Sequence, residues 1–203
     1  VELPGLDDSK KLSARKREKL YDAILAQALS TSIAKVDAHE IDQLNILQAS
    51  LKAMREAIDG LKIVPNHVLV DGHIRPGTSL EETVLVDGDA RSLSIAAASV
   101  LAKVYRDRLM VEFDATYPDY GFASHKGYGS PDHLEALRLH DPSPLHRRSF
   151  APVAQLLRTK RSEAYLSFAD GLEAADSPEE LERMGYFIKE ATGDLPEDEV
   201  RAL

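Results

Sequence analysis

Apolar residues recur every three or four positions in several parts of the chain, and this spacing predicts amphipathic helices. Ser13 is a typical helix N-cap, and Gly60 is a typical helix end. Ser130 followed by Pro131 marks another helix start, because proline is well tolerated at the first helical position. These patterns predict helices over residues 14–29, 38–59, 94–113, 131–140, 162–174 and 178–191.

Two short runs, HVLVDG and TVLVDG, are apolar and rich in valine, and they predict buried strands that end near Asp71 and Asp87. A third short strand is predicted over Thr31–Val36. Strands that alternate with helices indicate an α/β fold. Ligands of such folds bind at the carboxyl ends of strands, which makes Asp71 a candidate site residue. The alternative is an ordinary Asp-Gly turn residue, because Asp87, which precedes Gly88, and Asp89 look equally suitable as site residues.

Composition excludes several kinds of site. The 203 residues include no cysteine, which excludes disulfides, thiolate zinc sites and a cysteine nucleophile. The chain has no GxSxG, GxxxxGK[ST], GxGxxG or HExxH motif, so hydrolase-elbow, NTPase, dinucleotide-binding and zincin interpretations lack support. No apolar run is long enough to span a membrane. Absence of cysteine is typical of a reducing compartment, and we expect a cytoplasmic protein.

Charge is distributed unevenly along the chain. The formal net charge is −9, but residues 161–203 hold 12 acidic and 4 basic residues, so the remainder is nearly neutral. We therefore expect a domain over residues 1–160 and an acidic helical extension over 161–203. Basic residues cluster between Lys10 and Lys19, and such clusters contact phosphates in nucleic-acid-binding proteins. The alternative for this cluster is a solvated helix face.

Asp107 lies on the predicted long helix, four residues after Lys103. Its ordinary interpretation is an exposed helical ion pair with that lysine. In the alternative, Asp107 faces the sheet and joins Asp71, and paired carboxylates bind hard divalent cations such as Mg²⁺ or Mn²⁺. The loop from His125 to Gly129 is similarly open to two interpretations. Tyr128 is either a half-buried packing residue or an exposed ring that stacks on a sugar or base.

Seven segments together resemble bacterial ribonuclease HII, and they occur in the order of that family. The resemblance covers about residues 3 to 155. The segments are LDDSKKL, IDQLNILQASLKAM, LVDG, GDARSLSIAAAS, AKVYRDRLM, YPDYGFASHKGY and PLHRRSF.

The resemblance implies a ribonuclease H-like α/β fold with a mixed sheet flanked by helices. It implies an endonuclease that uses Mn²⁺ or Mg²⁺, in a two-metal site, to cut the RNA strand of RNA/DNA hybrids. Such an enzyme also nicks on the 5′ side of single ribonucleotides in duplex DNA, and serves ribonucleotide excision and DNA replication. We expect it to act as a monomer, without a membrane.

By matched motif, Asp71 and Asp107 would be catalytic metal ligands, and Tyr128 would pack on the deoxyribose at the RNA–DNA junction. The remaining candidates are basic residues and a histidine that would contact the substrate. They are Lys10, Lys11, His125, Lys126, Arg147 and Arg148.

The family pattern includes a segment, Asp-Glu-Ala-Gly-Arg-Gly, that supplies two further carboxylates before LDDSKKL. That segment is not present in this sequence, which begins with Val1. We therefore expect an N-terminally truncated ribonuclease HII. Two alternatives are a noncatalytic protein that binds hybrid duplexes and an interaction module that works through its acidic tail.

Overall fold

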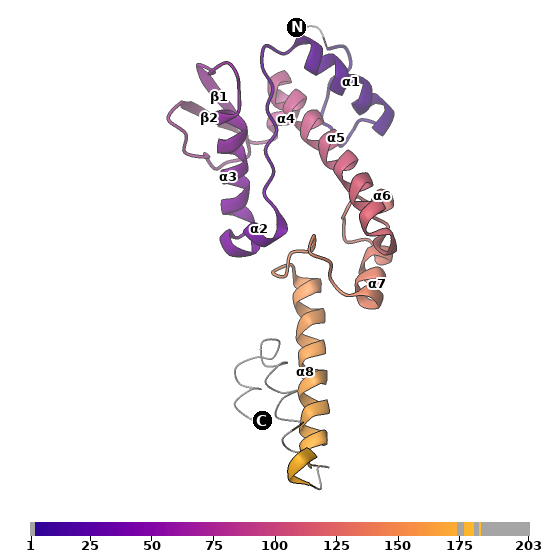
Figure 1. Cartoon of the computed structure of the whole chain (residues 1–203). Coiled ribbons are helices and arrows are strands. Elements are labelled where there is room, and N and C mark those ends of the chain that lie inside the picture. Colours follow the sequence, from indigo (N-terminus) through magenta and orange to yellow (C-terminus); the bar gives the residue numbers. More distant parts are fainter. Residues whose placement is uncertain (1–2, 174–176, 181–182, 184–203) are drawn as a thin grey trace. The chain divides into compact units, whose positions relative to one another are not determined.

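The computed structural model describes residues 3–173, 177–180 and 183 (Figure 1). The chain folds into two compact units, Val1–Arg147 and Arg148–Leu203, which are taken here one at a time. Among the described residues, no helix combines the length and the apolar character that a membrane span requires.

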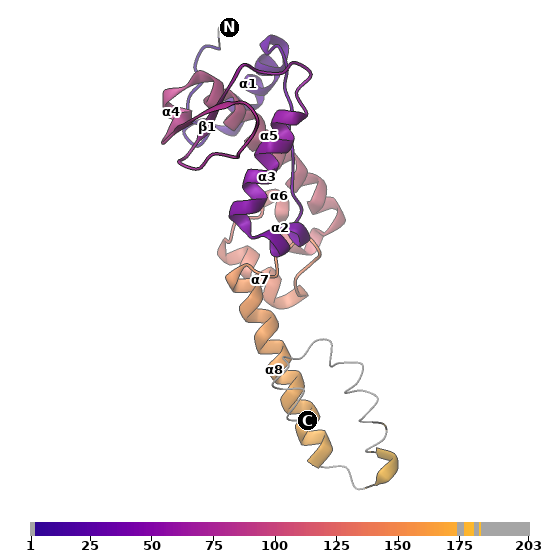
Figure 2. The ribbon, with the colours of Figure 1, turned by 90° about the vertical axis from the view of Figure 1, so that its left-hand side faces the viewer.

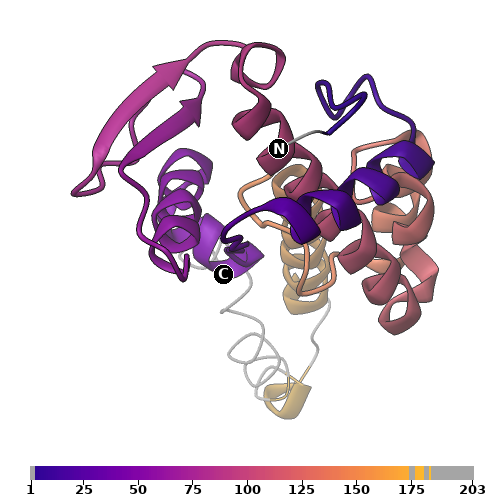
Figure 3. The ribbon, with the colours of Figure 1, turned by 90° about the horizontal axis from the view of Figure 1, so that it is seen from above.

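The first unit is built around the long helix α5 (Leu93–Thr116), against which α1 (Ala14–Gln27) packs (Figures 1 and 3). Ser13 caps α1 as predicted, because its hydroxyl oxygen accepts the Lys16 backbone N–H at 3.3 Å. The interface buries apolar side chains of both helices and of the segment before α1. These side chains are Leu12, Leu20, Ile24, Val100, Leu101 and Val104.

The predicted helix over residues 38–59 is two helices, α2 (Ala38–Leu44) and α3 (Ile46–Asp59). Asn45 separates them with a φ of 70° and a ψ of 162°, a positive-φ conformation outside the helical regions. Its side-chain oxygen accepts the Gln48 N–H at 3.1 Å and so caps α3. The apolar spacing runs through both helices, and it therefore does not show the break.

The sheet has two parallel strands among the described residues, β1 (His67–Asp71) and β2 (Glu81–Leu85). In their register, His67 pairs with Glu81 and Asp71 pairs with Leu85. The strand predicted over Thr31–Val36 is wrong, because this segment has no regular secondary structure. Its β-branched residues favour an extended chain, but a strand also needs a hydrogen-bonded neighbour.

Short helices complete the first unit. They are α4 (Gly88–Arg91), the 3₁₀ helix η1 (Pro118–Tyr120), α6 (Phe122–His125) and α7 (Pro131–His140). Figure 2 shows α4 beside β1 at one end of α5. The helix predicted over 131–140 is confirmed, with Ser130 accepting the His133 backbone N–H at 3.3 Å.

The second unit contains α8 (Ala151–Glu173). The helix predicted over 162–174 is the last part of this longer helix. Ser177 accepts the backbone N–H of Glu180 at 3.2 Å, which is the cap expected for the last predicted helix. Most of that helix, 178–191, lies outside the described residues. The division of the chain into a catalytic domain over 1–160 and an extension over 161–203 stays a prediction.

Candidate active site

Asp71 is the last residue of β1, and its side chain is held by the backbone of α4. Oδ1 of Asp71 accepts the Gly88 N–H at 2.8 Å. A Cβ added at Gly88 would lie 2.6 Å from Cδ1 of Ile95 and 3.1 Å from this same Oδ1, so the approach requires glycine. The residue is exposed, and none of the described residues donates a hydrogen bond to Oδ2. The carboxylate is therefore oriented by one oxygen and accessible at the other.

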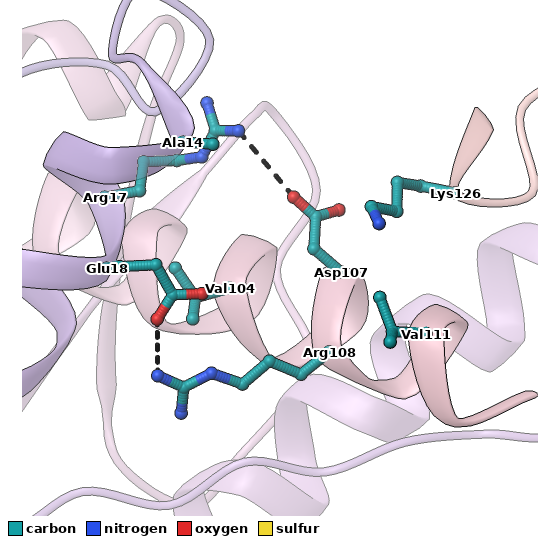
Figure 4. A pocket seen from close by; sticks show the side chains of 8 residues that line it. All are labelled: Ala14, Arg17, Glu18, Val104, Asp107, Arg108, Val111 and Lys126. Carbon is teal, nitrogen blue, oxygen red and sulfur yellow. Dashed lines mark hydrogen bonds and ion pairs between the residues drawn. The ribbon is translucent and has the colours of Figure 1, made fainter. Parts of the chain in front are cut away.

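Asp107 is placed differently, on the side of α5 that faces α1. Its Oδ1 accepts a hydrogen bond from Lys103 Nζ at 2.7 Å, and Oδ2 lies 3.7 Å from a guanidinium nitrogen of Arg17. The ion pair with Lys103 therefore forms, but it is not the exposed pair of the simpler interpretation, since only 18% of the Asp107 side chain is accessible. Figure 4 shows Arg17 and Lys126 extending toward Asp107 from opposite sides of a pocket.

The lining of this pocket combines apolar and charged side chains. They are Ala14, Arg17, Glu18, Val104, Asp107, Arg108, Val111 and Lys126. Arg108 is ion-paired with Glu18 on the wall that α1 contributes. Of the four cations at or beside Asp107, Arg17 belongs to α1, and Lys103 and Arg108 belong to α5. Their positive charge attracts anions to this pocket.

Arg17 connects the segment before α1 to Asp107. One guanidinium nitrogen donates to the carbonyl oxygens of Ser9 and Leu12, at 3.0 and 2.6 Å. The hydroxyl of Ser9 also lies 2.7 Å from that of Ser99 on α5. The sequence pattern places Arg17 in the exposed basic cluster, yet only 13% of its side chain is accessible. No signal in the sequence distinguishes it from its basic neighbours.

The same contacts fix the position of the segment that carries Lys10 and Lys11. The Lys10 backbone N–H donates to the carboxylate of Asp8 at 2.9 Å, and this bond is the main reason that the pKa of Asp8 is lowered. Lys11 is more than half exposed and lies 3.6 Å from Asp7. Both lysines therefore stand on an ordered turn from which they are accessible to a polyanion.

Tyr128 is joined to Asp107 by Lys103. Nζ of Lys103 lies 5.0 Å from the centroid of the Tyr128 ring and 3.5 Å from its hydroxyl. The guanidinium carbon of Arg106 lies 5.9 Å from the same centroid. Cations over an aromatic face are attracted by the ring quadrupole. The ring is 56% exposed, so the alternative of a half-buried packing residue does not describe Tyr128.

The other predicted substrate contacts are only partly gathered here. Lys126 borders the pocket, and its ammonium donates to the carbonyl oxygen of Ala123. Both ring nitrogens of His125 are already engaged with backbone groups of its own loop. Arg147 ends the first unit and Arg148 begins the second, so Arg148 has no described place relative to this site.

The donor chemistry of Asp71 and Asp107 suits Mg²⁺ or Mn²⁺, which prefer oxygen ligands. Among the described residues, however, no group of three or more histidines, aspartates and glutamates is placed to hold a metal ion. Asp71 contacts the start of α4, whereas Asp107 contacts Arg17 and Lys103, and no described contact joins the two carboxylates. They do not form an all-protein metal cage.

Comparison with known proteins shows the family of the chain. A sequence model described as ribonuclease HII matches residues 2–153. The chain belongs to the ribonuclease HII family. A ribonuclease HII from Polaromonas sp. is 56% identical over 156 residues, which cover 77% of this chain and 78% of the relative. One from Desulfitobacterium hafniense is 55% identical over 155 residues, or 76% of this chain and 60% of the relative.

A solved structure supports the fold. The ribonuclease H2 of Pyrococcus horikoshii OT3 aligns with a TM-score of 0.65 over 75% of this chain and 80% of that chain, at 23% sequence identity. The ribonuclease H-like α/β fold that the motifs implied is therefore confirmed. Membership of the ribonuclease HII family likewise confirms the expected class, a ribonuclease H-type endonuclease.

Proposed function

We propose that this chain cleaves the RNA strand of RNA/DNA hybrids and nicks duplex DNA on the 5′ side of single embedded ribonucleotides. The products would be a 3′-hydroxyl and a 5′-phosphate. The observation that carries the proposal is the contact chain of Arg17, Asp107, Lys103 and Tyr128, which links a largely buried carboxylate to an exposed aromatic ring. A carboxylate close to an exposed aromatic ring suits cleavage of a phosphodiester bond next to a sugar that packs on that ring.

Tyr128 would recognise the substrate by packing its exposed face on a sugar. Lys103 and Arg106 lie over the ring, and the attraction of their charges stabilises the observed position of the Tyr128 side chain. Aromatic packing tolerates every base, because each nucleotide has an apolar face. Discrimination of RNA from DNA requires a contact to the 2′-hydroxyl, which a sugar held against Tyr128 would present at a constant position.

The basic residues would position the duplex through its phosphates. Lys10 and Lys11 stand on the turn that Arg17 holds, and Lys126 borders the pocket of Asp107. Arg147 and Arg148 are further candidates. Phosphate contacts set the register of a protein on a duplex without reading its sequence, and they make binding depend on salt.

Asp71 and Asp107 would be the catalytic carboxylates, and they would hold Mn²⁺ or Mg²⁺ in a two-metal site together with substrate phosphate oxygens. Ions of this kind supply an activated water and stabilise charge on the leaving oxygen. The protein's own contribution is orientation. Gly88 fixes Asp71, while Lys103 and Arg17 hold Asp107 in position.

This proposal includes a setting for the reaction, namely ribonucleotide excision and DNA replication by a cytoplasmic monomer. A second candidate is a noncatalytic protein that binds hybrid duplexes. The observation in its favour is that no group of three or more histidines, aspartates and glutamates among the described residues is placed to hold a metal ion.

The test is a nicking assay on a DNA duplex with one ribonucleotide, run with Mn²⁺ and with Mg²⁺. We expect Asp71→Asn and Asp107→Asn to reduce nicking by about 100-fold or more, as loss of a group that stabilises reacting charge does. Asp59→Asn is the control, because Asp59 is exposed at the end of α3. Unchanged nicking by either site variant would exclude its catalytic role. Salt-dependent binding by wild type without any nicking would favour the noncatalytic alternative.

A further inference from the structure

Three histidines form a mostly buried cluster behind the loop that carries Tyr128. His133 on α7 is 5% exposed, and its ring stacks on that of His125 with centroids 4.3 Å apart and planes 14° apart. The His146 ring centroid lies 5.2 Å from that of His133, and Phe122 contacts all three rings. The proposed mechanism uses none of these rings for chemistry.

The hydrogen bonds of His146 and His133 determine where their protons lie. Nδ1 of His146 accepts the Ser143 backbone N–H at 3.0 Å, so the proton of this neutral ring is on Nε2. That Nε2 lies 2.9 Å from Nε2 of His133 and donates to it. The proton of His133 is therefore on Nδ1, which donates to the carbonyl oxygen of Tyr128 at 2.9 Å.

His125 follows the same rule. Its Nδ1 accepts the Gly127 N–H at 3.2 Å, and its Nε2 donates to the Tyr120 carbonyl oxygen at 2.7 Å. All three rings are thus satisfied as neutral imidazoles in one consistent set of tautomers. Burial supports this state, since desolvation lowers the pKa of His133 and lowers the pKa of His146 to about 4.

The loop between His125 and Ser130 needs such support. Lys126 has a φ of 52° and Gly127 a φ of 74°, so two successive residues are left-handed. For lysine this conformation costs on the order of 1 kcal/mol. The Tyr128 N–H donates to the His125 carbonyl at 2.9 Å, and the Ser130 N–H donates to the Tyr128 carbonyl at 2.8 Å. The His133 side chain joins the middle of this strained loop to α7 through the Tyr128 carbonyl oxygen.

We propose that His133 is a positioning residue for the substrate-packing face of Tyr128. Its Nδ1–H holds the Tyr128 carbonyl, and the backbone held in this way directs the ring toward Lys103 and solvent. His146 acts one step further back, because it sets the tautomer of His133. The inference rests on the proposed role of Tyr128 in substrate binding and adds the group that keeps the ring in place.

The experiment uses two substitutions that separate hydrogen bonding from packing. His133→Asn places an amide N–H near the position of Nδ1 and retains a donor for the Tyr128 carbonyl. His133→Leu keeps an apolar side chain of useful size but has no donor. His39→Asn, at an exposed histidine on α2, is the matched control. Circular dichroism of each full-length variant verifies that it is folded.

The first readout is amide hydrogen exchange at residues 126–130, which does not depend on activity. We expect faster exchange in His133→Leu and near wild-type exchange in His133→Asn. The second is steady-state nicking of the single-ribonucleotide duplex. We expect His133→Leu to raise KM about tenfold, since loss of aromatic packing on a nucleotide has an effect of this order, with kcat within about twofold. His133→Asn should restore most of this loss.

Unchanged exchange in His133→Leu would overturn the proposal, and so would faster exchange with an unchanged KM, which would leave His133 a purely structural role. Equal defects in the leucine and asparagine variants would exclude the hydrogen bond as the cause. If wild type itself does not nick the duplex, the proposed function fails, but the exchange experiment still decides whether His133 holds the Tyr128 loop.

Discussion

Two sets of polar side chains contact Tyr128, one charged and one made of neutral histidines. On the ring side, Arg17 and Lys103 are both ion-paired with Asp107. On the backbone side, the histidine cluster (His125, His133 and His146) contains no charged partner and is satisfied by neutral hydrogen bonds. The protein therefore holds one residue by two different physical means.

The difference teaches how each side responds to its surroundings. Ion pairs near the surface weaken as salt screens them, and they change little between neutral and mildly acidic pH. Buried imidazoles are nearly indifferent to salt, but a proton added to them creates a buried charge with no anionic partner in the cluster. Added salt should therefore weaken the contacts of the Tyr128 ring, whereas low pH should weaken the hydrogen bond to the Tyr128 backbone.

The largest expected effect comes from Arg17→Met. The change removes two hydrogen bonds to carbonyl oxygens and one of the two ion pairs of Asp107, so that the pair with Lys103 remains. We expect the free energy of unfolding to fall by roughly 2–4 kcal/mol, because charged donors to poorly exposed acceptors are costly to lose. Urea denaturation measures this change. Arg15→Met is the control, since Arg15 is an exposed residue of the same helix, and an equal loss there would contradict a special role for Arg17.

Low pH should reduce the stability of the protein through the histidine cluster. The folded-state pKa of His146 is lowered to about 4 from 6.5, first by desolvation and then by His133. Between these values the unfolded chain binds more protons at this ring, so the contribution of His146 to stability falls as pH is lowered from about 6.5 to about 4. After allowance for the partial exposure of the ring, we expect a loss of about 1–2 kcal/mol.

Urea denaturation across this pH range measures the loss, and His146→Gln should flatten the curve because the amide does not titrate. Tyr120, His125 and His133 are the titratable groups around the ring, and His133 has a lowered pKa of its own. A wild-type curve that is flat between pH 6.5 and 4 would contradict the neutral cluster.

A smaller effect is expected for the contact between Lys103 and Tyr128. A double-mutant cycle with Lys103→Met and Tyr128→Leu should give a coupling energy of about 0.5–1 kcal/mol, the size of a partly exposed cation–π contact. The coupling should shrink between 0.1 and 1 M NaCl. A coupling of zero at low salt would show that the two side chains are neighbours without a mutual attraction.

The smallest effect is expected for Arg138→Ala. Arg138 donates two hydrogen bonds to Glu135 on α7, at 2.9 and 2.7 Å, and this pairing lowers the pKa of Glu135. Both side chains are more than half exposed, so solvent and salt screen the pair. The urea midpoint should stay within experimental error of wild type. A shift of the urea midpoint as large as that of Arg17→Met would contradict the expectation that a poorly exposed ion pair stabilises the protein more than an exposed one.

Local patterns in the sequence predicted much of the secondary structure. The helix at Pro131–His140 and the strand at His67–Asp71 are confirmed, because a proline after an N-cap serine and a run of valines act within a few residues. The continuous helix over 38–59 and the strand over Thr31–Val36 are wrong. The first depends on the backbone of one asparagine, and the second depends on a neighbouring strand, so neither is decided by spacing.

The sequence by itself determined the family, the class of enzyme and the candidate residues Asp71, Asp107 and Tyr128, whose roles stay predictions. The tertiary structure decided which side chains serve them. The hydroxyl of Ser9 is hydrogen-bonded to that of Ser99, 90 positions later in the sequence. Arg17 is ion-paired with Asp107, and His133 is hydrogen-bonded to the Tyr128 carbonyl oxygen. Periodicity reports only which face of an element is apolar. Pairing between polar groups depends on how folded elements approach one another, and it leaves no repeat in the sequence.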